Sequence, residues 1–386
     1  MEAQFAKARI AEHPERSPAL SLGGTRSKDA ERPRALPGIR KIAVLRANAI
    51  GDFIFALPAL ESLRVAYGNA EIVLLGQPWH RRYLEGRPGP VDRVEVVPRK
   101  RGVREDRETA GEEDRPEVFD RFYADMRSER FDLALQMHGG GRNSNPFLLQ
   151  LGARITAGSA TPDAARLDYT LPYIYWQHEI ARLLEVVGMV GARPVTLVPR
   201  LALTQVDLDE SHRVVPQTDA PLVAVHPGVG DPRRQWPPEK FAAVGDALAN
   251  ADARVLLTGA GFEASITGAV RNAMKCAAQD LNGRLSIGGL AALLSRCCVV
   301  VSNDSGPLHI AAAVGAPTVG IYWAGNAINA GTLFRARSRP HLSWRMECAE
   351  CGRNTIYDPC AHRHSFVDLV TVEEVTASAL ELYLGL

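Results

Sequence analysis

Short apolar segments rich in β-branched residues alternate with segments of helical composition along most of the chain, and this alternation begins twice. In the first half the predicted strands are residues 41–47, 71–75, 91–97 and 131–136. In the second half they are residues 222–226, 254–258, 299–302 and 318–322. Strands that alternate with helices are typical of parallel βαβ units. The sequence therefore predicts an α/β protein built from two successive Rossmann-like halves with a cleft between them.

The helical segments and the connections complete this division. The predicted helices are residues 53–67, 173–187, 238–249, 262–276, 287–295, 308–314 and 371–384, and Pro58 is expected to kink the first of them or delay its start. Residues 191–221 contain several prolines and little periodicity, which indicates an interdomain connection that carries a strand. The densely charged residues 99–115 predict a solvated loop. We expect domains at residues 39–200 and 201–370, followed by a C-terminal helix in residues 371–386.

Composition narrows the class of protein. The 386 residues exceed what one hydrophobic core usually supports, and 46% of them are hydrophobic, as in ordinary globular proteins. The 45 basic and 44 acidic residues leave a net charge of +1, so no strong field favours nucleic acid. No apolar run is long enough for a membrane span, and residues 1–38, which lack the apolar core of a secretory signal, are expected to form a disordered arm. We expect a cytoplasmic protein.

The segment V-V-V-S-N-D-S-G-P-L-H-I, residues 299–310, predicts a buried strand, a tight turn and the start of a helix. Ser305 can cap that helix, and Pro307 suits its first turn. The N–H groups and the dipole of a helix start attract anions such as phosphate, and His309 can add a donor. Asp304 follows the carboxyl end of the strand, where ligands of open α/β sheets bind. A capped joint without a ligand is the alternative.

Three further turns at strand ends carry polar or charged residues. In N-A-I-G-D, residues 48–52, Asp52 can accept a proton from a hydroxyl nucleophile, or it can simply cap a helix. The loop H-P-G-V-G-D-P-R-R-Q-W-P, residues 226–237, holds Gly228, Arg233 and Arg234 and is suited to bind phosphate, and a solvent-facing basic loop is the alternative. Its prolines and Trp236 indicate that the loop is ordered. In T-G-A-G-F-E, residues 258–263, Gly261 lies in a tight turn, and Glu263 can bond a ribose or favour its own helix start.

Two other clusters remain open at this stage. The glycine-rich residues 138–143 follow a strand of the first half and can line an acceptor or form a flexible loop. Cys348, Cys351 and Cys360 lie close to His362 and His364, and these are ligand types that zinc prefers. Their spacing is not that of a standard zinc finger, so free thiols or a disulfide are the alternatives.

Together these motifs resemble glycosyltransferase family 9, the ADP-heptose:lipopolysaccharide heptosyltransferases. Three segments carry the resemblance, which extends over residues 41–384: L-R-A-N-A-I-G-D-F-I-F-A-L-P-A-L, H-P-G-V-G-D-P-R-R-Q-W-P and S-N-D-S-G-P-L-H-I-A-A-A-V-G-A-P-T-V. The resemblance implies a GT-B fold, in which the closing helix packs back on the first domain. It also implies an inverting reaction that needs no metal and no cofactor, with the donor, ADP-heptose or another nucleotide sugar, bound by the second domain.

The resemblance also implies roles for individual residues. Asp52 matches the catalytic base, Arg234 a residue that contacts the donor phosphates, and Asp304 the acid near the donor sugar. The turn that binds the pyrophosphate corresponds to Ser305, Gly306 and His309. Gly261 stands near the place of the family's ribose-binding acid, and Glu263 follows two residues later.

The implied acceptor is a lipid-linked glycan such as the lipopolysaccharide core. Reaching it requires transient contact with a membrane surface, for which the basic and aromatic residues 79–83 are candidates. Two other classes of function remain. The G-A-G turn is shared with nicotinamide-dependent oxidoreductases, although Ala264 replaces the third glycine of their fingerprint. A non-catalytic protein that binds nucleotide sugars is the other alternative.

Overall fold

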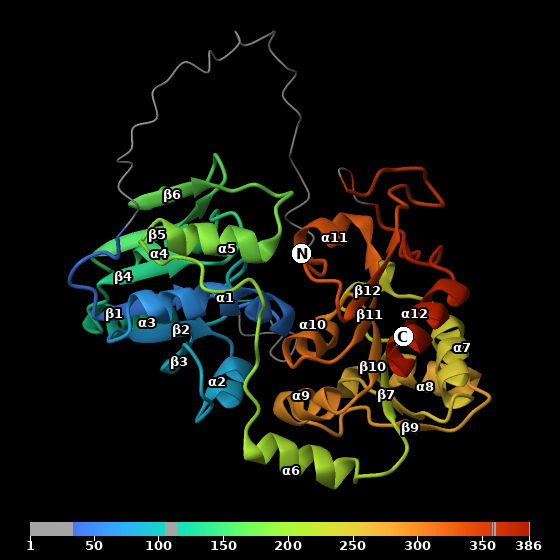
Figure 1. Cartoon of the computed structure of the whole chain (residues 1–386). Helices are drawn as coiled ribbons and strands as arrows, with labels where there is room; N and C mark the ends of the chain where they lie inside the picture. The colour runs from blue at the N-terminus through green and yellow to red at the C-terminus, as the bar shows by residue number, and fades with distance from the viewer. Residues whose placement is uncertain (1–33, 105–114, 357, 359, 386) are drawn as a thin grey trace, which may run out of the picture.

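The computed structural model describes residues 34–104, 115–356, 358 and 360–385. The predicted arm therefore lies outside the described residues up to residue 33, and so does most of the charged stretch 99–115. Two parallel six-stranded sheets, each with helices on both faces, stand side by side (Figure 1). This arrangement confirms the predicted α/β fold of two Rossmann-like halves. Among the described residues, no helix is both long and apolar enough to cross a bilayer.

The first sheet has the strand order β3-β2-β1-β4-β5-β6. Its strands are β1 (Lys41–Leu45), β2 (Glu71–Gly76), β3 (Arg93–Val96), β4 (Leu133–Gln136), β5 (Ile155–Ala160) and β6 (Tyr169–Pro172). Its helices are α1 (Ile50–Ala66), α2 (Pro78–Leu84), α3 (Pro116–Ser128), α4 (Ser144–Leu149) and α5 (Glu179–Gly188). Apolar side chains of α1 and α5 cover one face, and those of α3 and α4 the other. The order reverses beside β1, so β1 and β4 end at the switch point where such sheets bind ligands.

The second sheet repeats this topology with the order β12-β11-β10-β7-β8-β9. Its strands are β7 (Leu222–His226), β8 (Arg254–Leu257), β9 (Ala278–Asp280), β10 (Val299–Asn303), β11 (Thr318–Trp323) and β12 (Ser338–Ser343). The helices are α6 (Gln205–Val214), α7 (Pro238–Ala249), α8 (Ala264–Ala273), α9 (Ile287–Ser295), α10 (Gly306–Ala313), α11 (Ala324–Ala330) and α12 (Val372–Leu384), with short 3-10 turns η1 (Pro232–Arg234) and η2 (Gly261–Glu263). Here β7 and β10 end at the switch point.

The C-terminal helix α12 packs on the second domain, so the expectation that it returns to the first domain is wrong. Val375 and Ala379, one turn apart on α12, are fully buried in the same core as Phe241 of α7. The Tyr383 hydroxyl donates to the Ala251 carbonyl at 2.9 Å. The apolar face of α12 is therefore covered by the second domain, and Figure 1 shows α12 beside α7.

Three local expectations also change. The interdomain connection carries helix α6 instead of a strand, because Thr204 and Asp207 form a capping box at its start. Helix α1 begins at Ile50, ahead of the predicted residue 53, and continues through Pro58. The Ser62 hydroxyl donates to the Pro58 carbonyl at 2.7 Å inside this helix. Helix α5 begins only at Glu179, and the sequence did not indicate strands β5, β6, β9 and β12.

Candidate active site

The turn between β10 and α10 forms the centre of the site. Asp304 follows the last residue of β10, and α10 begins at Gly306 with Ser305 at the N-cap position, as predicted. The Ser305 side chain makes no capping hydrogen bond, and its hydroxyl lies 3.3 Å from that of Ser302. The N–H groups of Leu308 and His309 bond to the Ser305 carbonyl, at 3.1 and 3.4 Å. The first turn of α10 is thus fixed by its backbone, and the Ser305 hydroxyl contacts Ser302 instead of capping the helix.

Asp304 is a buried carboxylate held by three side chains from different elements. Arg234 Nη1 donates to it at 3.2 Å, and Asn326 Nδ2 of α11 donates at 3.0 Å. His309 Nε2 lies 3.2 Å from its other oxygen. Burial alone would raise the pKa of Asp304, but His309, Arg234 and Asn326 outweigh it and bring this pKa below the usual value. Asp304 therefore stays ionised and orients the two basic groups.

The loop that carries Arg234 is tied to the same turn. Asn303 accepts a hydrogen bond from the Trp236 backbone at 3.0 Å and donates to the Pro227 carbonyl at 2.8 Å. The Trp236 ring is fully buried, and its Nε1 donates to the Val370 carbonyl at 3.0 Å. The structure thus confirms an ordered loop after β7, as the prolines and Trp236 predicted.

Gly228, Gly261 and Glu263 lie together at the ends of β7 and β8. A Cβ on Gly228 would come within 2.0 Å of Glu263 Oε1, so the glycine makes room for this carboxylate. Glu263 accepts a hydrogen bond from the Ala260 N–H at 2.7 Å and lies 4.0 Å from His226 Nε2. The space beside Gly261 is open, with no atom within 4 Å of an added Cβ. The carboxylate thus supports its own turn, and contact with a ribose stays a prediction.

Asp52 lies in the first turn of α1 in the first domain, where Ala49 and not Asp52 is the N-cap residue. The almost fully buried Arg46 donates to the Asp52 carboxylate at 3.2 Å and to the Asp52 carbonyl at 3.0 Å. It also donates to the Glu179 carboxylate at 2.9 Å. The Asp52 side chain keeps 40% of its surface exposed. The surrounding protein nevertheless desolvates the carboxyl group and raises its pKa, with Glu179 adding to this effect and Arg46 and His309 opposing it.

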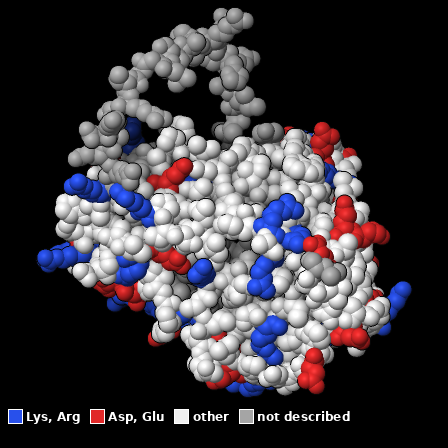
Figure 2. Space-filling model, viewed as in Figure 1, with Lys and Arg blue, Asp and Glu red and all other residues white. Residues whose placement is uncertain are grey.

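The starts of α1 and α10 meet where the two domains touch (Figure 1). A Cβ added to Gly51 would lie 3.0 Å from His309 Cδ2, and one added to Gly306 would lie 2.2 Å from Ile50 Cγ2. The Phe55 ring packs against the His309 ring with centroids 4.6 Å apart. Asp52 and the turn 302–309 therefore adjoin each other. Figure 2, viewed as in Figure 1, shows Lys and Arg side chains in the middle of the visible face of the molecule.

The glycine-rich residues 138–143 adjoin Asp52 through Arg46, which donates to the Met137 carbonyl at 2.5 Å. Burial and the Arg46 charge lower the pKa of His138 to about 3, so this imidazole is neutral. Asn145 Nδ2 donates to the Ser159 carbonyl at 3.2 Å and occupies the space beside Gly141. The segment is packed in place and belongs to the surroundings of Asp52, while its contact with an acceptor stays a prediction.

Sequence reasoning missed Arg46, Glu179 and Asn326. Arg46 carries a signal that could have identified it, because a charged residue directly after a buried strand needs a partner. Glu179 and Asn326 lie far from their partners in the sequence and carry no comparable signal. Residues 79–83 are also less exposed than expected, since His80 and Tyr83 are buried.

Comparisons with known proteins agree with the geometry. A family model described as glycosyltransferase family 9 (heptosyltransferase) matches residues 120–356. Lipopolysaccharide heptosyltransferase 2 of Salmonella typhimurium is 24% identical over 302 residues, which cover 73% of this chain and 82% of that protein. A glycosyl transferase family 9 structure from Veillonella parvula superposes with a TM-score of 0.74 at 20% identity and covers 92% of this chain and 100% of that one.

The E. coli structure of ADP-heptose lipopolysaccharide heptosyltransferase II superposes with a TM-score of 0.69 at 17% identity and covers 90% of this chain and 99% of that one. The superpositions confirm the expected GT-B architecture of two Rossmann-like domains.

Proposed function

The chain belongs to glycosyltransferase family 9, and we propose that it transfers a heptose from ADP-heptose to a lipopolysaccharide core or a related glycan. It is a glycosyltransferase, so the oxidoreductase and the non-catalytic binding protein that the sequence left open are wrong. One observation carries the proposal: Asp52 of the first domain lies beside the turn that begins α10 in the second. The two groups that glycosyl transfer needs, a base and a diphosphate site, thus come from opposite domains.

The second domain supplies the charge that a departing diphosphate requires. As the bond between the sugar and the phosphate breaks, negative charge builds on the phosphate oxygens. Arg234 and His309, both held by Asp304, stand beside the N-terminus of α10 and can stabilise this charge. The donor phosphates therefore bind at the turn 302–309 without a catalytic metal, with Gly228, Gly261 and Glu263 next to the nucleoside.

The first domain supplies the base. Asp52 accepts the proton of the acceptor hydroxyl, and the resulting oxygen attacks the anomeric carbon on the face opposite to the diphosphate, which inverts the configuration. The raised pKa of Asp52 makes its carboxylate a stronger base than an ordinary one. Arg46 orients it through contacts to both its side chain and its carbonyl.

The proposal also includes a cytoplasmic location and transient contact with a membrane surface, where a lipid-linked acceptor would reside. His178 Nε2 of the first domain lies 2.8 Å from the Gly331 carbonyl of the second. Exposed apolar residues on both sides of this contact support binding to a membrane surface. Ile174 and Trp176 precede this contact in the first domain, and Leu333 and Phe334 follow it in the second. Of the originally expected surface, Arg81 and Arg82 remain exposed.

The test is a transfer assay with ADP-heptose and heptose-deficient lipopolysaccharide in the presence of EDTA, with ADP release and the acceptor mass as readouts. The proposal expects an acceptor heavier by one heptose and a product of inverted anomeric configuration. Asp209→Asn on the exposed face of α6 serves as the control that retains activity. The assigned donor would be refuted if the folded protein transferred the sugar of another nucleotide sugar but none from ADP-heptose.

A further inference from the structure

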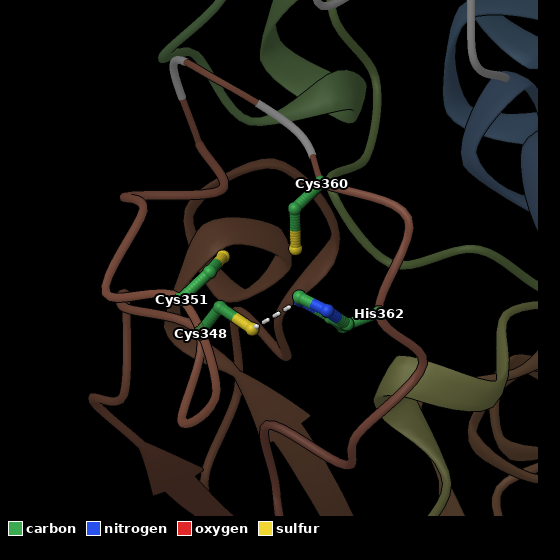
Figure 3. A group of neighbouring side chains, drawn as sticks. All are labelled: Cys348, Cys351, Cys360 and His362. Atoms are coloured by element: carbon green, nitrogen blue, oxygen red, sulfur yellow. Dashed lines mark hydrogen bonds between the residues drawn. The ribbon is translucent and has the colours of Figure 1, made fainter.

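The segment between β12 and α12 brings together side chains that the proposed reaction does not use. The ligand atoms of Cys348, Cys351, Cys360 and His362 all lie within 4.8 Å of one another (Figure 3). The sequence left free thiols, a disulfide and a metal open for these residues. We propose that they form a structural Cys₃His zinc site.

The distances fit a tetrahedral ion with little movement. Zn–S bonds of about 2.3 Å and Zn–N bonds of about 2.0 Å place neighbouring ligand atoms roughly 3.5–3.8 Å apart. Cys348 Sγ and His362 Nδ1 already lie 3.4 Å apart. Figure 3 shows the three sulfur atoms and the imidazole pointing toward a common centre. Closing the cluster around one ion requires shifts of about 1 Å or less.

The backbone at Cys348 and Cys351 has the form of a knuckle that presents two thiolates. The Cys348 N–H donates to the Arg353 carbonyl, and the Gly352 N–H donates to the Cys348 carbonyl, both at 2.9 Å. Gly352 has φ +69°, a left-handed conformation that glycine adopts without strain. An isolated antiparallel bridge between Glu347 and Asn354 closes the hairpin. This local structure directs both sulfur atoms to the same side.

His362 is oriented by a carboxylate on its far side. Its Nδ1 faces the thiols, while its Nε2 lies 2.9 Å from Glu350 Oε2. Histidines that ligate a metal commonly donate their other ring N–H to a carboxylate, which fixes the ring and strengthens the ligand. Glu350 also pairs with His364. A disulfide would explain two of the thiols but would give no role to the third or to the oriented imidazole.

A zinc ion at this site would fix the segment after His362, which contacts the loop of Arg234. The role of that loop in donor binding rests on the proposed function. The Phe366 N–H donates to the Arg233 carbonyl at 2.6 Å, and the Ser365 hydroxyl donates to the Gln235 carbonyl at 2.7 Å. Residues on both sides of Arg234 are thus bound by the chain that follows His362. Zinc in this position would limit the motion of the donor loop and would take no part in the reaction.

The experiment counts zinc in the full chain, purified without a polyhistidine tag under reducing conditions, by inductively coupled plasma mass spectrometry. We expect about one zinc per chain, as a closed structural site holds. Cys351→Ser and His362→Ala are expected to lose most of it, and Cys276→Ser, which changes a thiol on another loop, to keep it. Less than about a tenth of a zinc per chain, stoichiometric iron instead, or equal zinc in all variants would overturn the assignment.

A second measurement tests the effect on the donor loop. We expect Cys351→Ser to weaken ADP binding several-fold by isothermal titration while the far-ultraviolet circular dichroism stays unchanged. Unchanged ADP affinity in a zinc-free protein would overturn the supporting role. Zinc content is measured without any substrate, so its outcome does not depend on whether the proposed transferase activity is found.

Discussion

Adding one methyl group at Gly306 tests the contact between the domains. The new Cβ of Gly306→Ala would lie 2.2 Å from Ile50 Cγ2, whereas the next atoms, Ile50 Cβ and the Gly51 nitrogen, lie 3.7 and 3.8 Å away. Carbon atoms in contact stand about 3.5–4.0 Å apart, so the new methyl group must displace the Ile50 side chain or separate the starts of α10 and α1 by roughly 1.5 Å. Because one atom causes the clash, removing it should relieve the clash.

The magnitude follows from the cost of overpacking. Inserting a methyl group into a well-packed contact costs about 1–3 kcal/mol, which corresponds to a loss of roughly 5- to 150-fold in kcat/KM if the closed arrangement is the active one. Ile50→Ala removes Cγ2, so the double variant should recover most of this loss. The difference between the single and double variants is the coupling energy of the pair.

The assay is steady-state transfer together with ADP affinity for both single variants and the double variant. Gly268→Ala in α8 is the control, because no atom lies within 4 Å of its added Cβ. That variant should be as active as the wild type and slightly more stable. Wild-type activity of Gly306→Ala, or failure of Ile50→Ala to rescue it, would refute the contact between the two helices in the active form.

Two further substitutions test the charges of the site. Glu179→Gln removes a charge that raises the pKa of Asp52, so the substitution should lower this pKa. The base is active above its pKa and loses activity as the pH falls through it. The acid limb of the kcat/KM profile should therefore move to lower pH. The exposed Glu185→Gln should leave the profile in place, and an unchanged profile for both would contradict the role of Glu179. Arg234→Ala should raise the donor KM by roughly 10- to 100-fold, as expected for a lost charged hydrogen bond. It should also lower the unfolding temperature, because the buried Asp304 loses a charged partner. An unchanged KM would show that Arg234 serves only to hold Asp304.

Much of the fold could be predicted because local signals agree with the final packing. Helices α7 and α9 begin and end where the sequence indicated, since Pro238 and Ser286 mark their starts and apolar residues fill their inner faces. The turn 302–309 was found for the same reason. Strand β12 was missed because its sequence S-R-P-H-L-S has almost no apolar residues, as an edge strand permits.

The remaining differences arise from contacts that sequence distance hides. Whether α12 covers the first or the second sheet depends on which apolar face is left open, and no residue of α12 indicates this. The environment of Asp52 depends on Glu179, which lies more than a hundred residues away and is joined to it through Arg46. Helix α6 shows the opposite case, because its capping residues Thr204 and Asp207 were present in a stretch interpreted from its prolines and its weak periodicity.

The proposed reaction depends most on a base from one domain acting on a donor bound by the other. The measurement that tests this directly is the donor dissociation constant of Asp52→Asn, determined beside its transfer rate. We expect the rate to fall by roughly 10²- to 10⁴-fold, as for loss of a general base, while donor affinity changes by less than about threefold. A parallel loss of donor affinity, or a transfer rate close to that of the wild type, would contradict it.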